Sequence, residues 1–139
     1  MKKIDHIAIA VNSLEESVKL FSDLLEAEPE LEHVPDEKVN TAVYRLGGAS
    51  LELVEPASDN SPISEFLEKR GSGLHHICFQ VEDINSAISL LQKKGFELID
   101  EKPKKGSGGT SIVFLHPKST GGVLIELNSK PESEAEDAD

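Results

Sequence analysis

Short stretches of the chain alternate apolar and polar residues, which is the pattern of β-strands with one buried face. Between them, apolar residues recur every three or four positions, as on an amphipathic helix. Together the patterns predict helices at 13–25, 61–70 and 84–94, and strands at 3–11, 29–34, 39–46, 50–55, 73–81, 96–100, 110–116 and 122–128.

Capping and turn residues support several of these boundaries. Asn12 and Ser13 precede the first helical run and Asp83 precedes the last, at positions where a side-chain oxygen can cap a helix. Pro62 suits the first turn of the middle helix. Gly47-Gly48 is a hairpin signal between two predicted strands.

The second half of the chain repeats the pattern of the first. Lys3–Val11 aligns with Gly73–Val81, which places His6 opposite His76. The alignment continues with Leu14, Val18 and Phe21 on Ile84, Ile88 and Leu91, with Val43-Tyr44 on Val113-Phe114, and with Leu51–Leu53 on Ile125–Leu127. Each half therefore reads as one βαβββ module, and the chain as a duplication.

The predicted fold class is α+β, with the two βαβββ modules at about 3–56 and 73–128 and helix 61–70 linking them. Side by side, two such modules form a curved mixed sheet with the helices outside. We expect one domain over 1–128, which is long enough to bury a core. The tail 129–139 is acidic without a large apolar residue, so we expect it to be disordered.

Composition narrows the class of partner. A net charge of −12 disfavours nucleic acid, which binds basic surfaces. No apolar run reaches the roughly 18 residues that span a bilayer, and the N-terminus lacks the apolar segment of a signal peptide. The single Cys78 excludes an internal disulfide. We therefore expect a cytoplasmic protein that binds neither membrane nor nucleic acid.

Two histidines and two glutamates stand out when the faces of the strands are compared. Side chains alternate between faces along a strand. On four predicted strands the ionisable residue lies opposite the aliphatic face: His6, Glu52, His76 and Glu126. The repeat makes His6 equivalent to His76 and Glu52 equivalent to Glu126, so a two-fold relation between the modules can bring all four to one point.

These four residues predict one divalent metal site. Two imidazoles and two carboxylates suit Zn, Co, Ni or Mn and leave room for water or substrate. Carboxylates on an inner, partly apolar face are costly unless they are paired or bind a metal. Any one of the four alone is as well explained by a solvated sheet face, but four at symmetric positions favour the metal.

The remaining candidate residues carry weaker signals. His75 faces the packing side at a strand start and suits a rim or hydrogen-bonding role. His33 belongs to a polar stretch, and His116 precedes Pro117 at a strand end, so both favour a surface or structural role. Cys78 faces inward with no partner base visible in the sequence. Phosphate-binding loops and the nucleophile elbow of hydrolases are absent from the sequence.

The paired modules with His on the first and fifth strands and Glu on the fourth and eighth resemble the vicinal-oxygen-chelate superfamily, which includes glyoxalase I. Within it the chain is most similar to the methylmalonyl-CoA epimerases, over nearly all of residues 3–128. The resemblance is carried by Lys3–Val11, Leu51–Pro56, Ser61–Leu67, Gly73–Ile77 and Phe114–Leu127.

This resemblance implies a metal-dependent epimerase that interconverts (R)- and (S)-methylmalonyl-CoA by removing the α-proton through a metal-stabilised enolate. Glu126 is the first choice for proton transfer, a role that competes with its role as a ligand. Some family members have a second base on the third strand, where this chain has Thr41. Glu52, a metal-bound water or a loop residue then remain as the second base.

The resemblance also implies an acyl-CoA partner and a homodimer. Lysines near the predicted loops are candidates for the CoA phosphates, although ordinary solvated lysines explain them equally well: Lys102, Lys104, Lys105 and Lys118. The Gly-rich segment 106–109 either folds over substrate or forms a long hairpin.

Three other activities remain open at this stage. A glyoxalase I-type lyase on a glutathione hemithioacetal uses the same His and Glu set. A dioxygenase fits less well, because it needs two His, one carboxylate and open positions on iron. A non-catalytic drug-binding protein of the same fold needs no metal, so it leaves the inward His and Glu residues unexplained.

Overall fold

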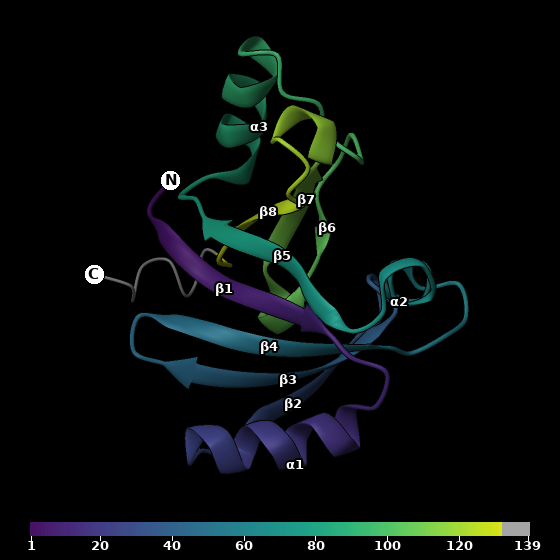
Figure 1. Cartoon of the computed structure of the whole chain (residues 1–139). Helices are drawn as coiled ribbons and strands as arrows, with labels where there is room; N and C mark the ends of the chain where they lie inside the picture. Colours follow the sequence, from purple (N-terminus) through teal and green to yellow (C-terminus); the bar gives the residue numbers. More distant parts are fainter. Residues whose placement is uncertain (132–139) are drawn as a thin grey trace. The chain divides into compact units, whose positions relative to one another are not determined.

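The computed structural model describes residues 1–131, and its backbone groups into two compact units, residues 6–75 and residues 1–5 with the chain from 76 onward. The elements are, in chain order, β1 Lys3–Ala10, α1 Leu14–Leu25, β2 Glu30–Val34, β3 Val39–Leu46, β4 Ala49–Pro56, α2 Pro62–Arg70, β5 Gly73–Gln80, α3 Ile84–Lys93, β6 Lys104–Lys105, β7 Ser111–Leu115 and β8 Ile125–Ser129, with short 3₁₀ turns at Ser107–Gly109 and Pro117–Ser119 (Figure 1).

The unit of residues 6–75 is a sheet in the order β2-β3-β4-β1. Strand β1 runs parallel to β4, whereas β3 pairs antiparallel with both β2 and β4. The two-residue turn Gly47-Gly48 joins β3 to β4 as predicted, with Leu46 paired to Ala49. The parallel β1–β4 pair requires the crossover through α1 that a βαβββ module supplies.

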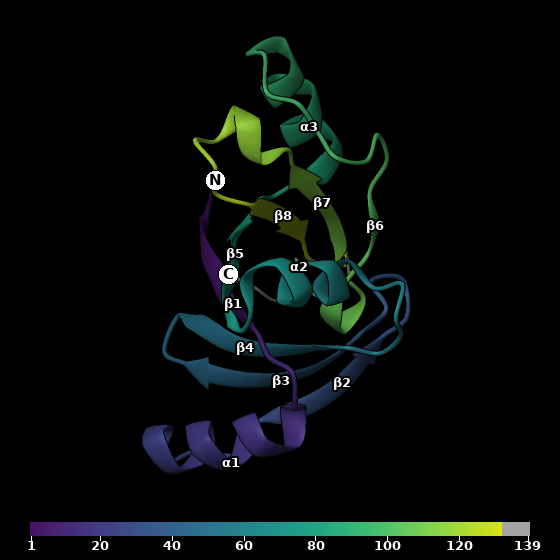
Figure 2. The ribbon, with the colours of Figure 1, turned by 45° about the vertical axis from the view of Figure 1, so that its right-hand side comes forward.

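Both faces of this sheet are covered within the unit, since α1 and α2 lie on opposite sides of β3 and β4 (Figures 1 and 2). Under α1 the buried core consists of Val11, Ala42, Tyr44 and Leu53. The Ser13 side chain caps α1 by accepting from the Glu16 N–H. Under α2 the buried core consists of Ala8, Ala10, Val34, Val39, Val54 and Ile63.

The second unit repeats this plan with the strand order β5-β8-β7-β6. Strand β5 runs parallel to β8, and β7 pairs antiparallel with β8 and β6. Helix α3 packs on one face, where the buried core consists of Val81, Ile84, Ile88, Val113 and Leu127. Asp83 stands at the N-cap of α3 and its carboxylate accepts a hydrogen bond from the Ser86 hydroxyl. The predicted α+β class with two βαβββ modules is confirmed.

One predicted strand is wrong. Residues 96–100 pair with β7 only through an isolated bridge between Leu98 and Leu115, and a two-residue strand follows at Lys104–Lys105. The Ile99 N–H donates to the Phe114 carbonyl and the His116 N–H to the Glu97 carbonyl, so the segment does lie along β7. The apolar pattern there marks packing of the half-buried Leu98 against the core rather than a full strand.

The alignment of the repeat is wrong by one residue at β3 and β7. Val43 pairs with Glu52 across the sheet, whereas Phe114 pairs with Glu126. Val43 is therefore equivalent to Phe114 rather than to Val113, and Tyr44 faces α1. The one-residue shift moves every side chain of a strand to the other face.

The last strand ends one residue later than predicted. Strand β8 runs through Ser129, one residue into the expected tail, and positions 132–139 of that tail lie outside the described residues. Over residues 1–131, the helices are too short or too polar to cross a membrane.

Candidate active site

In the unit of residues 6–75, the parallel pairing of β1 with β4 brings His6 to Glu52. The register places Ala8 beside Glu52, so His6 lies two residues earlier on the same face. Nδ1 of His6 is 3.1 Å from Oε2 of Glu52, and the two side chains are only 6% and 9% exposed.

The second unit builds the same pair from the equivalent residues. Strand β5 runs parallel to β8 with Cys78 beside Glu126, which again places the histidine two residues earlier, at His76. Nε2 of His76 is 3.0 Å from Oε1 of Glu126, with 8% and 4% of the side chains exposed. The duplicated register therefore produces two buried His–Glu pairs, one in each unit.

The donor atoms of these pairs fit a metal ion. Two ligand atoms that bind one ion, each about 2.1 Å away, lie roughly 3 to 3.5 Å apart. The 3.1 Å and 3.0 Å separations of the two ion pairs are within this range. A carboxylate buried to this degree is costly unless a cation, a hydrogen-bond donor or a metal stabilises it. Each pair can thus supply one imidazole nitrogen and one carboxylate oxygen to a divalent ion.

An aromatic ring and a lysine flank the second pair. The Phe114 ring meets the His76 ring edge-on, with centroids 5.4 Å apart, and it holds the imidazole in place. Nζ of Lys104 lies 5.6 Å from the centroid of the Phe114 ring and 3.7 Å from Oδ2 of Asp100. Lys104, a candidate for CoA binding, therefore lies on the sheet face that carries His76.

The structure reveals two polar residues that the sequence analysis did not single out. Gln80 and Asn128 are register partners on β5 and β8, two residues beyond Cys78 and Glu126, and are 6% and 5% exposed. The signal in the sequence was strand alternation: Gln80 lies four residues from His76 and Asn128 two residues from Glu126, so each shares the face of the site residue on its strand. It was not decisive, since Ala10 and Val54 occupy the equivalent places in the first module.

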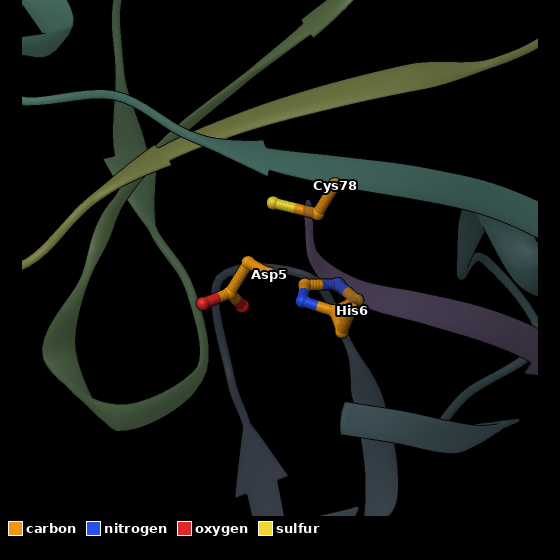
Figure 3. Close-up of side chains that lie close together, drawn as sticks. All are labelled: Asp5, His6 and Cys78. Atoms are coloured by element: carbon orange, nitrogen blue, oxygen red, sulfur yellow. The ribbon is translucent and has the colours of Figure 1, made fainter. Parts of the chain in front are cut away.

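Cys78 is buried and lies near a carboxylate that strand alternation did not predict. The ligand atoms of Asp5 and Cys78 lie within 4.8 Å of each other, and Figure 3 shows these side chains with His6, which follows Asp5 on β1. Asp5 stands one residue from His6, so regular alternation places it on the other face.

Thr41 is the third-strand residue that the family resemblance aligns with a second base. It is 2% exposed, and its hydroxyl donates to the Glu32 carbonyl at 3.3 Å. Its strand pairing with Val54 puts it on the face of Glu52. The third strand therefore has a hydroxyl group at position 41 and no carboxylate that could act as a base.

The other histidines make local contacts. His75 packs edge-on against Phe66, with ring centroids 4.8 Å apart. Nδ1 of His33 lies 2.9 Å from Oδ1 of Asn40, and Nδ1 of His116 accepts from the Lys118 N–H. Among the candidate lysines, Lys118 pairs with Glu97 at 3.0 Å. Lys102 and Lys105 remain candidates from sequence.

Comparisons with known proteins show the family of the chain. The family model of the Glyoxalase/Bleomycin resistance protein/Dioxygenase superfamily matches residues 5–114. The mitochondrial methylmalonyl-CoA epimerase of Dictyostelium discoideum is 42% identical over 92% of this chain and 78% of its own length.

Two solved structures share the fold. A methylmalonyl-CoA epimerase from Mycobacterium tuberculosis aligns with a TM-score of 0.89 at 31% identity, over 96% of this chain and 91% of its own. A variant of the Streptomyces coelicolor methylmalonyl-CoA epimerase in complex with 2-nitronate-propionyl-CoA aligns with a TM-score of 0.90 at 32% identity, over 95% and 96% of the two chains.

Proposed function

The chain belongs to the methylmalonyl-CoA epimerases of the glyoxalase superfamily, and on that premise we propose that it interconverts (R)- and (S)-methylmalonyl-CoA. The observation that carries the proposal is the pair of buried His–Glu contacts at equivalent places in a chain 42% identical to an epimerase. An acyl-CoA thioester is the substrate class, because a related epimerase binds a propionyl-CoA analogue.

The proposed metal ligands are His6, Glu52, His76 and Glu126, which together hold one divalent ion, Co, Mn, Ni or Zn. Support comes from the donor set and from the spacing within each pair. A bound ion supplies Lewis-acid stabilisation of the negative charge that develops on the thioester oxygen.

Glu126 is the proposed base. One of its oxygens lies against His76, and the carboxylate has a second oxygen for the proton. The α-carbon–hydrogen bond breaks, the proton moves to the carboxylate, and the electron pair shifts onto the thioester oxygen to give the enolate. Burial of Glu126 to 3% exposure keeps bulk water from quenching this intermediate.

Inversion requires a proton from the opposite face, and we assign that step to Glu52. Thr41 has no carboxylate, and its hydroxyl already donates to a backbone carbonyl. Glu52 is the equivalent of Glu126 in the other module and is buried to a similar degree. A bound water or a loop residue are the competing donors, and substitution of Glu52 separates them from it.

Deuterium uptake tests the function. The protein is incubated in D₂O with methylmalonyl-CoA, with metal added or with a chelator, and the thioester is analysed by mass spectrometry. We expect one deuteron at the α-carbon with metal, and little without. Absence of exchange in the metal-loaded protein, together with turnover of a glutathione hemithioacetal, contradicts the epimerase and favours the glyoxalase-type lyase.

A homodimer and a cytoplasmic location complete the proposal. They rest on the family resemblance and on the sequence composition. Light scattering after size-exclusion chromatography tests the first, with an expected mass twice that of the chain.

A further inference from the structure

The two modules fill the equivalent part of their inner sheet face in different ways. In the first, Ala10 pairs with Val54 beyond the His–Glu contact, and α2 packs over them. In the second, the same positions hold Gln80 and Asn128. Here a face that is apolar in one copy carries two amides in the other.

Both amides are buried with an unsatisfied acceptor. Oε1 of Gln80 and Oδ1 of Asn128 have no hydrogen-bond partner within residues 1–131, and the side chains are 6% and 5% exposed. A buried polar atom without a partner destabilises the fold, and an apolar replacement of similar shape is neutral or stabilising. Two such atoms on paired residues of one sheet face therefore point to a ligand that brings a hydrogen-bond donor.

The strand register sets the distance between the two amides and Glu126, the proposed base. Gln80 and Asn128 are register partners, and Asn128 lies two residues beyond Glu126 on the same face. Two residues of a strand span about 7 Å. The donor group of the ligand should therefore lie about that far from the carboxylate that removes the α-proton.

The proposed substrate class has one suitable donor at this range. The carboxylate and thioester carbonyl of an acyl-CoA only accept hydrogen bonds at neutral pH. The first N–H is the pantetheine amide next to the thioester, five covalent bonds from the α-carbon, which is about 6 Å in an extended chain. This spacing is close to the distance set by the strand register.

We propose that Gln80 and Asn128 bind the pantetheine arm of the acyl-CoA by accepting its amide N–H nearest the thioester. One N–H can be shared between two neighbouring oxygens. The inference rests on the proposed function for the identity of the ligand, and it assigns these residues to positioning of the substrate rather than to proton transfer.

Two small thioesters test the contact directly. One is the propionyl thioester of N-acetylcysteamine, which keeps the amide N–H, and the other is the same compound with an ester oxygen in place of that N–H. Ligand-observed NMR titration, which covers weak affinities, measures binding of both to the full chain. We expect the wild type to bind the amide compound about tenfold more tightly than the ester compound, because the ester leaves the buried acceptors without a donor and so weakens binding by about that factor.

The variants exchange the amides for their counterparts in the first module, Gln80→Ala and Asn128→Val. Each is expected to lower the preference for the amide compound, and the double variant is expected to bind the two compounds equally. Ser129→Ala is the control, because Ser129 is also buried but lies on the other face of β8. It should keep the tenfold preference.

Two results overturn the inference: no preference for the amide compound in the wild type, or an unchanged preference in the double variant. Binding of these compounds needs no epimerisation. Deuterium exchange by the wild type therefore tests the proposed function separately.

Discussion

Glu126 is 3% exposed, and one of its oxygens lies 3.0 Å from Nε2 of His76. Glu52 stands in the same relation to His6 in the other module, at 3.1 Å. The four residues were predicted as candidates because each side chain lies opposite an aliphatic strand face, but which histidine contacts which glutamate was not predicted. The contacts themselves depend on strand register, which the sequence does not specify residue by residue.

At the residue scale, Glu126→Gln should separate the proposed role of this side chain as a metal ligand from its role in proton transfer. The amide keeps an oxygen that can bind a metal, although more weakly, but it cannot take up the α-proton. We expect deuterium uptake to fall by about 10² to 10⁴. Uptake within about threefold of wild type in metal-loaded E126Q would remove Glu126 from the proton-transfer role.

Glu52→Gln is the matched substitution and has a different expected result. With Glu126 intact, the α-proton still exchanges with solvent, but proton return to the opposite face is lost. Mass spectrometry should therefore detect deuterium in one epimer, and chiral analysis should show little inversion. If E52Q inverts the substrate at the wild-type rate, a water or a loop residue supplies the second proton.

At the scale of elements, helix α1 stabilises the fold from the outer side of the first sheet. Tyr44 is fully buried, and its hydroxyl donates to the Val18 carbonyl and lies 2.9 Å from Oγ of Ser22. Tyr44→Phe removes these contacts without changing the sheet face that carries Glu52. We expect a loss of about 1 kcal/mol in the free energy of unfolding in urea, with unchanged deuterium uptake. A large fall in uptake at full folding would contradict this separation.

Helix α3 should lose stability in acid. The Ser86 hydroxyl holds the pKa of Asp83 below its ordinary value. A carboxyl with a lower pKa in the folded state stabilises the fold above its unfolded pKa of about 3.9, and this contribution disappears as the pH falls through the folded pKa. The difference in unfolding free energy between wild type and Asp83→Asn should therefore be present at pH 6 and vanish in strong acid. A difference that grows on acidification would contradict the assignment.

The elements also show where prediction from sequence succeeds and fails. The apolar residues and the flanking turn signals located strand Val39–Leu46 to the residue, and side chains on both of its faces are buried. The same signal misplaced a strand at 96–100, where Leu98 is packed against the core but pairing is limited to one bridge. Gln80 and Asn128 could not be identified as candidate site residues from the sequence, because an amide on a strand shows its lack of partners only when the neighbours are placed.

At the scale of the whole molecule, duplication divides the proposed ligand set between two modules. Each βαβββ unit supplies one histidine and one glutamate through a parallel strand pair. Two protein ligands bind a divalent ion weakly, whereas four complete a structural or catalytic set. The proposal of one shared ion therefore predicts that neither module alone retains it.

The number of divalent ions bound per chain tests this claim most directly. Inductively coupled plasma mass spectrometry of the purified, dialysed chain should give one divalent ion per chain for the wild type and for His33→Ala, whose histidine is exposed. His6→Ala and His76→Ala should each fall to about a tenth of that, because each removes a ligand from the same ion. Retention of a full ion in either variant, or two ions per wild-type chain, would contradict a single site shared by the two modules.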